Sequence, residues 1–125
     1  MNYRGKILND MAGLIRLLSP HCQDRETIDA LGAMVADRGK WSRAHGLFNQ
    51  IRRKALAAER SLDRKLACQY SFEEICAKTL FNLSASNAPF DPDSPYWIIP
   101  NAIAFARHVG VEDAQIIKVV APTDA

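Results

Sequence analysis

Apolar residues recur at alternating steps of three and four through most of this chain, which is the spacing of an amphipathic helix. The first such stripe comprises Ile7, Leu8, Met11, Leu14, Ile15 and Leu18. Ser19-Pro20 ends it, because proline cannot donate an interior helical hydrogen bond. Asp24 is the expected N-cap of a second helix, and Gly39 is the expected stop. The residues of this second helix that we expect to be buried are Ile28, Leu31, Met34 and Val35.

A third stripe, the basic stretch, runs from Arg38 to about Leu66. Its apolar residues are Trp41, Ala44, Phe48, Ile51, Ala55, Ala58 and Leu62. An unbroken helix from Trp41 to Leu66 would be about 39 Å long at a rise of about 1.5 Å per residue. Because that length is large for a small domain, a break near Gly46 or within residues 57–60 is the alternative.

The segment after the basic stretch predicts another helix followed by a loop. Ser71, with Glu74 three residues later, has the pattern of a capping box and predicts a helix start. Residues 84–95 are expected to form a loop, because Ser, Asn, Asp and three prolines dominate them. The helix that begins at the capping box would bury Phe72, Ile75, Cys76, Thr79, Leu80 and Leu83.

The C-terminal part predicts two more helices. One covers about 96–109, with Pro100 in its first turn or at a kink and Gly110 at its end. The other covers 112–120, where Glu112 suits a helix start. The β-branched residues of 112–120 leave a strand as the alternative, but no partner strand is visible elsewhere, so a helix is favoured.

These patterns predict an all-α fold, a compact bundle of five to six helices that contains antiparallel helical hairpins. At 125 residues, a single domain over 1–125 can bury a core without metal or disulfide cross-links. A hydrophobic fraction of 48% and a charged fraction of 24% are those of a globular protein and exclude a disordered chain. No apolar run approaches the roughly 20 residues that span a bilayer, and no signal-peptide pattern is present.

Charge is distributed unevenly along the chain. The net charge is only +2, but residues 38–65 contain nine Lys/Arg against Glu59 and Asp63, a local charge of +7. Arrays of this kind bind phosphate backbones or acidic proteins, and they also occur as ordinary solvated helix faces. The candidate partner-binding cations are Arg38, Lys40, Arg52, Arg53, Lys54, Arg60 and Arg64.

Tyr96 and Trp97, which follow a loop containing three prolines, are the second candidate contact. Tyr and Trp are common interface anchors, and a stiff loop loses little entropy on binding. The alternative, which is favoured, is that Phe90 and Trp97 fill the core while Asp93 or Ser94 caps the last helix.

Cys22, Cys68 and Cys76 form an odd, widely spaced set that implies no disulfide framework. Reduced thiols in a cytoplasmic protein are therefore expected. No Cys or His pair has metal-ligand spacing, so we expect buried cysteines rather than a metal site, and no cofactor signature is present. An enzyme that pairs Cys22 with a histidine is a distant alternative.

One segment, residues 26–56, resembles a single tetratricopeptide-type helical hairpin. The residues that carry the resemblance are Leu31-Gly32, Val35, Gly39, Trp41, Ala44, Phe48 and Ile51. On this view Gly32 and Ala44 let two antiparallel helices approach closely, and Phe48 fills the wider end. No second copy follows, since Lys65-Leu66 stands where Leu-Gly would be expected. The resemblance implies docking of a protein and not catalysis.

The expectation from these patterns is a non-enzymatic binding or regulatory protein that docks an acidic macromolecule through the basic stretch. A protein partner is slightly preferred, because the hairpin resemblance and the aromatic residues both favour it. Nucleic acid is the alternative and a small Cys/His enzyme is the distant one. No membrane partner is expected. The heptad-like spacing from Trp41 to Leu62 also permits a homodimer, although its alanines make a weak seam, so an intramolecular hairpin is favoured.

Overall fold

A computed structural model of the chain describes residues 3–84 and 94–121, and within these residues every regular element is helical. The six α-helices are α1 (Tyr3–Leu18), α2 (Arg25–Ala36), α3 (Ala44–Arg60), α4 (Arg64–Ser84), α5 (Ile98–His108) and α6 (Asp113–Val120). Three short 3-10 helices join them, namely η1 (Ser19–His21), η2 (Arg38–Arg43) and η3 (Ser94–Trp97). The prediction of an all-α bundle of five to six helices is therefore confirmed.

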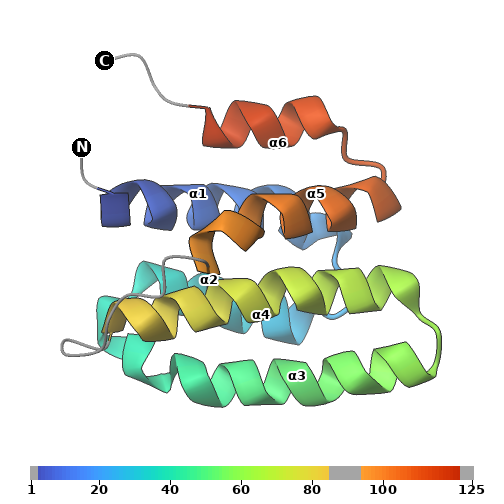
Figure 1. The fold of residues 1–125 in the computed structure, drawn as a ribbon, viewed down its shortest axis with the longest axis horizontal. Coiled ribbons are helices and arrows are strands. Elements are labelled where there is room, and N and C mark those ends of the chain that lie inside the picture. The colour runs from blue at the N-terminus through green and yellow to red at the C-terminus, as the bar shows by residue number, and fades with distance from the viewer. Residues whose placement is uncertain (1–2, 85–93, 122–125) are drawn as a thin grey trace.

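Helix α4 lies at the centre of the bundle. Helix α3 runs antiparallel to it on one side, and α5 lies along its other side (Figure 1). Helix α2 also packs on α4, α1 packs on α2, and α6 covers α1 and α5. The largest side chains with almost no exposed surface include Phe72 of α4, Phe105 of α5 and Met11 of α1. The core is thus shared among helices that are distant in sequence.

Several helix ends lie where local chemistry predicts them. Helix α1 ends before Ser19-Pro20. The Asp24 side chain caps α2 by accepting a hydrogen bond from the Thr27 backbone at 3.3 Å. Glu112 and Gln115 form a capping box at the start of α6, so the helix rather than the strand is confirmed for this segment. Pro100 is the third residue of α5, where its missing N–H costs no interior bond.

The predicted capping box at Ser71 and Glu74 is wrong, because both residues lie in the interior of α4. The helix begins seven residues earlier, at Arg64, where Asp63 accepts a hydrogen bond from the Leu66 backbone at 3.0 Å. Similarly, α2 ends at Ala36 and not at Gly39. The Asp37 backbone N–H donates a hydrogen bond to the Met34 carbonyl oxygen. The helix therefore ends three residues before Gly39, where the sequence predicts its end.

The basic stretch is not one helix. It is divided among η2, α3 and the start of α4, with a sharp turn at residues 61–63. At this turn Leu62 has φ 59° and is 81% exposed, so it does not belong to the apolar face as predicted. Leu47 is buried on that face, whereas Phe48 is only partly buried. The helix break therefore lies just after residues 57–60, one of the two positions predicted for it.

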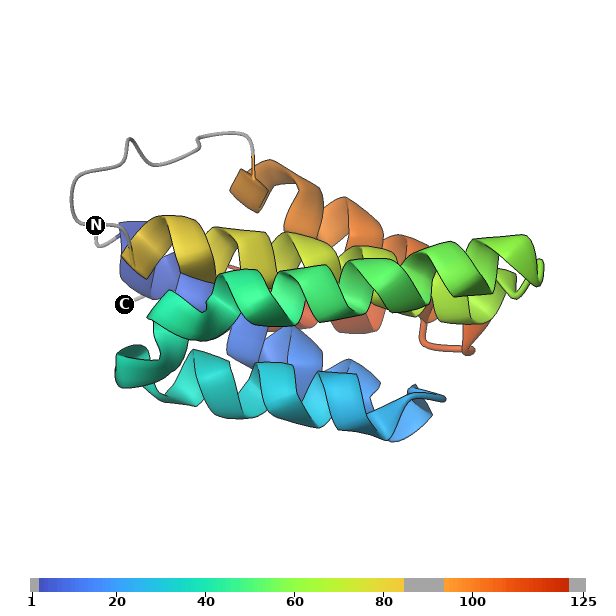
Figure 2. The ribbon, with the colours of Figure 1, turned by 90° about the horizontal axis from the view of Figure 1, so that it is seen from below.

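The apolar face of α3 packs mainly against α4 and only to a small extent against α2. A Cβ at Gly32 would lie 3.4 Å from Ile15 of α1, with no atom of α3 within 4 Å. The expected close approach of Gly32 and Ala44 is therefore wrong, because Gly32 faces α1. Helices α2 and α3 do run antiparallel on either side of η2 (Figure 2).

None of the helices in the described ranges combines the length and the apolar character that crossing a membrane requires.

Candidate functional site

The outer face of α3 presents two arginines that have no partner among the residues the structure describes. Its buried residues, which include Ile51, Ala55 and Ala58, share one side, and Arg53 and Arg60 lie opposite them. Being seven residues apart, the two arginines are separated by about 10.5 Å along the axis. Both side chains are exposed, and neither forms an ion pair or hydrogen bond within the described part of the chain.

Three of the other predicted cations are engaged within the fold. Lys54 Nζ lies 3.1 Å from Asp24 Oδ2, at the start of α2. Arg52 Nη1 lies 3.9 Å from Glu74 Oε2 of α4. The Arg38 guanidinium lies 5.8 Å from the centre of the Trp41 ring, within cation–π range. The structure therefore neutralises part of the charge that the composition assigns to a binding face.

The turn between α3 and α4 displays an apolar side chain among cations. Its backbone bonds, from Leu62 to Glu59 and from Asp63 to Ala58, are those of a Schellman cap. The position with positive φ is usually glycine, but here it is Leu62. On α3, Leu56 is 43% exposed and lies between Arg53 and Arg60.

We call this surface the arginine–leucine ridge. It comprises Arg53, Leu56, Arg60, Leu62 and Arg64. Leu62 and Arg64 also line a shallow hollow of about 180 Å³ at the turn, whose other lining residues are Ala58, Glu59, Asp63 and Ala67. Exposed Lys40 and Arg38 lie in η2, beyond the other end of α3.

Tyr96 and Trp97 are exposed, at 71% and 56% respectively, so the favoured interpretation that Trp97 fills the core is wrong. Both residues belong to η3, which packs on α4 and α5. In Figure 1, α5 lies on one side of α4 and α3 lies on the other. Phe90 and Asp93, which belong to the same interpretation, lie outside the described residues.

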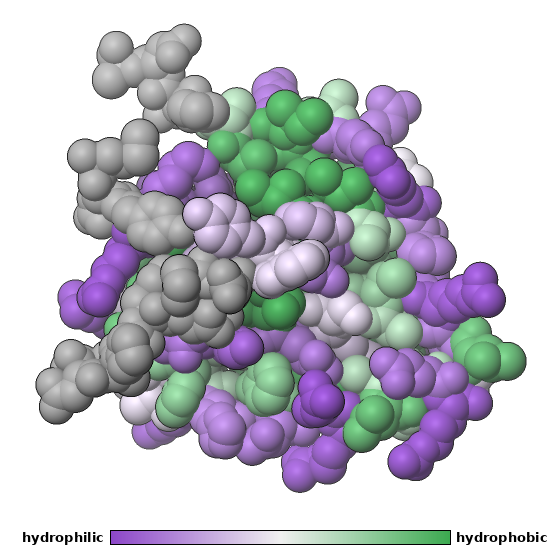
Figure 3. Space-filling model, viewed as in Figure 1, coloured by the Kyte–Doolittle hydropathy of each residue, from purple (hydrophilic) through white to green (hydrophobic). Residues whose placement is uncertain are grey.

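Figure 3 shows the face on which α4 and α5 lie. Strongly apolar side chains gather at its upper edge, over α5 and α6, while polar side chains surround them (Figure 3). Ile117 of α6 is exposed, and Ile99 and Ile103 of α5 are partly buried. The apolar surface of this face is therefore not confined to Tyr96 and Trp97.

A buried polar cluster connects α2 to α4. Glu73 has no exposed surface, and its Oε2 accepts hydrogen bonds from Thr27 Oγ1 at 2.9 Å and from Gln69 Nε2 at 3.1 Å. Glu73 Oε1 is buried and has no hydrogen-bond partner among the described residues. Burial, which outweighs these hydrogen bonds, raises the pKa of Glu73 from 4.5 to about 7.

Asp24 joins this cluster to the surface. Its Oδ2 accepts hydrogen bonds from Tyr70 Oη at 2.6 Å and from Lys54 Nζ at 3.1 Å. Burial alone would raise the pKa of Asp24, but these bonds outweigh it and hold that pKa below 3.8. Gln69 Nε2 donates to the Asp24 carbonyl at 2.8 Å. One aspartate thus caps α2, neutralises Lys54 and anchors α4.

This cluster leaves a signal in the sequence that was not among the predicted sites. Gln69 and Glu73 occupy the same helical stripe as Cys76, Leu80 and Leu83, so two polar residues stand at buried positions. A helix predicted to start at Ser71 excludes Gln69, so the prediction does not place Gln69 and Glu73 on one stripe.

The thiols offer no nucleophile in this arrangement. Cys22 is buried, and burial together with the nearby Glu73 raises its pKa to about 12. Burial also raises the pKa of Cys68 and of Cys76. Among the residues that the structure describes, no three His, Cys, Asp or Glu side chains are grouped as metal ligands.

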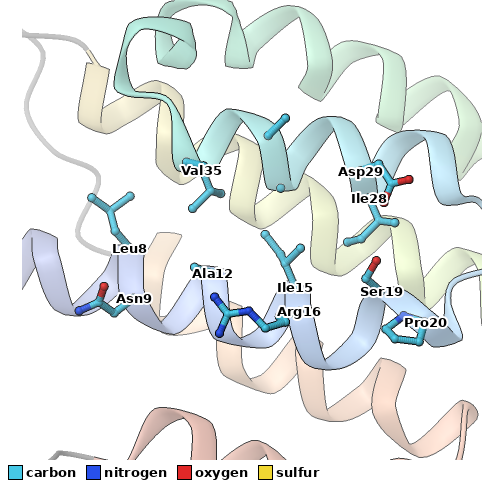
Figure 4. A pocket seen from close by; sticks show the side chains of 13 residues that line it. Leu8, Asn9, Ala12, Ile15, Arg16, Ser19, Pro20, Ile28, Asp29 and Val35 are labelled. Carbon is cyan, nitrogen blue, oxygen red and sulfur yellow. The ribbon is translucent and has the colours of Figure 1, made fainter.

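Two open grooves flank α1. In the one between α1 and α2, about 530 Å³ in volume, Ile15 points toward α2, where Ile28 and Val35 face it (Figure 4). The other groove, of about 640 Å³, lies between α1 and α6, and Arg16 lines both. Their walls are mainly small and aliphatic, and the polar residues that line the first groove include Ser19 and Asp29, whose Oδ1 lies 3.6 Å from Arg25 Nη2.

Comparison with known proteins gives no further indication of what this site binds. No family model matches the chain, and neither do any of the curated proteins or solved structures with which it was compared.

Proposed function

We propose that this protein is a non-enzymatic binding protein whose arginine–leucine ridge docks an acidic, amphipathic segment of a partner protein. The observation that carries the proposal is the alternation, along α3 and its turn, of exposed leucines with arginines that have no partner in the described part of the chain. Carboxylates of the partner would pair with Arg53, Arg60 and Arg64. Its apolar side chains would cover Leu56 and Leu62.

The same alternation favours a protein over a nucleic acid. A phosphate backbone is uniformly charged and does not cover exposed leucines, whereas one face of an amphipathic helix can satisfy both groups. Nucleic-acid affinity also depends on the number of free cations, and Lys54 and Arg52 are already close to carboxylates. Glu59 and Asp63 further reduce the positive charge near the turn.

Tyr96 and Trp97 of η3, which packs on α4 and α5, are a proposed secondary contact. Their exposure supports this role, since buried aromatics could not reach a partner. We place the protein in the reducing cytoplasm, which the three free cysteines support, and a regulatory role would follow from partner docking without catalysis.

Site-specific photo-crosslinking tests the proposal. A photoreactive amino acid at Asn49, on the outer face of α3 one turn before Arg53, would be activated in cell lysate with and without nuclease. We expect one discrete protein adduct that resists nuclease. It should be lost in Arg53→Glu/Arg60→Glu and weakened in Leu56→Ser, but not in Lys118→Glu on α6.

Three results would overturn this assignment. The first is an adduct with nucleic acid that decreases steeply with salt and is indifferent to Leu56→Ser, which would establish the nucleic-acid alternative. The second is equal labelling in the charge-reversal and control variants. The third is the absence of any discrete adduct.

A further inference from the structure

The outer side of α3 carries a straight seam of exposed side chains. Its members, which fall within about 60° of one another around the helix axis at about 100° per residue, are Asn49, Arg53, Leu56 and Arg60. All four are exposed, and Leu56 keeps 43% of its surface accessible. Glu59 precedes Arg60 and therefore lies about 100° away from it, outside the seam. The seam thus presents a cation, an apolar side chain and a second cation in that order.

The distances along this seam determine what shape of partner can match it. At about 1.5 Å per residue, Leu56 lies about 4.5 Å beyond Arg53, and Arg60 lies about 6 Å beyond Leu56. Side chains on one face of a second helix recur at these same two steps, three and four residues apart.

An extended segment matches the seam less well. Its side chains on one face recur at about 6.7 Å, so two of them lie about 6.7 Å or about 13.4 Å apart. Both distances differ by about 3–4 Å from the roughly 10.5 Å that separates Arg53 from Arg60 along the axis. A helix therefore fits the seam better than a strand.

The charge of the seam determines which side chains that helix must carry. Neither arginine has an ion pair or hydrogen bond within the described part of the chain, so both guanidinium groups are open to carboxylates. Leu56, which lies between them, needs an apolar side chain to cover it.

We propose that the segment bound by the ridge is an α-helix with two carboxylates seven residues apart, which pair with Arg53 and Arg60. An apolar residue three or four positions after the first carboxylate covers Leu56. This inference rests on the proposed function, because it specifies the partner of the same surface.

Selection from a library of helical peptides tests the spacing. The probe is a phage-displayed, alanine-based helix of about 20 residues, long enough to be helical alone, with one face randomised among Glu, Lys, Leu and Ser. We expect the parent protein to enrich pairs of Glu seven residues apart over pairs four or eleven apart. The latter pairs share a face but not the distance, so each loses one exposed ion pair, which corresponds to about a threefold difference in binding.

Arg60→Glu separates this spacing from a general attraction to acidic peptides. It reverses the charge at one end of the seam only, so the selected peptides should exchange one Glu for Lys and retain the Glu seven residues away. Lys118→Glu on α6 should leave the selected pattern unchanged, and circular dichroism checks that both variants remain helical.

The outcomes distinguish this inference from the proposed function. Peptides that need Arg53 and Arg60 but show no preference for the seven-residue spacing would overturn the inference and leave the proposed function in place. Exchange of both Glu residues, or of neither, in selection on Arg60→Glu would also overturn it. If every selected peptide bound Arg53→Glu/Arg60→Glu equally well, or none bound the parent protein, both would fail.

Discussion

Replacement of Glu73 by glutamine should change how the stability of this protein depends on pH. Glu73 has no exposed surface, and only one of its two carboxyl oxygens is hydrogen-bonded within the described residues. Burial raises its pKa from 4.5 to about 7, so the folded state holds a proton that the unfolded state has already released. The contribution of Glu73 to the free energy of unfolding should therefore be fully present below pH 4.5 and should be lost as pH rises through 7.

The size of the effect follows from the same shift. A difference of about 2.5 pKa units corresponds to about 3 kcal/mol, taken at about 1.4 kcal/mol per unit. The glutamine side chain would keep the length and the hydrogen-bonding oxygen of Glu73 but could not ionise. At pH 8 we expect Glu73→Gln to be more stable than the parent protein by up to about 3 kcal/mol, and at pH 4.5 we expect nearly equal stability.

Urea unfolding followed by circular dichroism at intervals between pH 4.5 and 8.5 measures this difference. Asp24 does not confound it, because its lowered pKa places its stability change below pH 4. Glu74→Gln is the matched control: burial raises the pKa of Glu74 but nearby Arg52 opposes the rise, so the pH slope should largely persist. Stability that increases from pH 5 to 7, or an identical slope in Glu73→Gln and the parent protein, would refute the reasoning.

Three further changes test packing and caps by urea unfolding. Gly13→Ala would place a Cβ 2.6 Å from an α6 side chain and should lower the free energy of unfolding by about 1–3 kcal/mol. Gly46→Ala, where a Cβ would meet no atom within 4 Å, should raise it by up to about 1 kcal/mol. Equal effects of the two changes would contradict the packing of α1 on α6. Leu62→Gly should stabilise by up to about 1 kcal/mol, because φ 59° strains leucine but not glycine, and a loss of stability would argue against that strain. Tyr70→Phe should cost about 1.5–3 kcal/mol by removing the 2.6 Å hydrogen bond to Asp24, and a neutral result would show that this bond contributes nothing.

Helix ends were predictable where the decisive groups are neighbours in sequence. Asp24 and the Thr27 backbone are three residues apart, and so are Glu112 and Gln115. The prediction failed at Ser71, because a pattern suited to capping does not end a helix that already extends through it. Asp63 provides the cap instead, at the turn that follows α3.

The candidate site was less predictable, because it depends on which side chains meet across the fold. Composition assigns the basic stretch a charge of +7, but Lys54 meets Asp24, thirty residues away in sequence. Exposure of Trp97 also depends on how η3 lies on α4 and α5, and local sequence favoured the opposite outcome.

The sequence by itself determined the helical class, most of the helices and the sign of the charge on α3, since periodicity, caps and composition act over a few residues. Only the tertiary structure decided that α3 packs mainly on α4, that Gly32 faces α1, and that Glu73 is buried next to Thr27. These outcomes depend on contacts between segments that are distant in the chain. Their energies come from burial and desolvation, which no local pattern records.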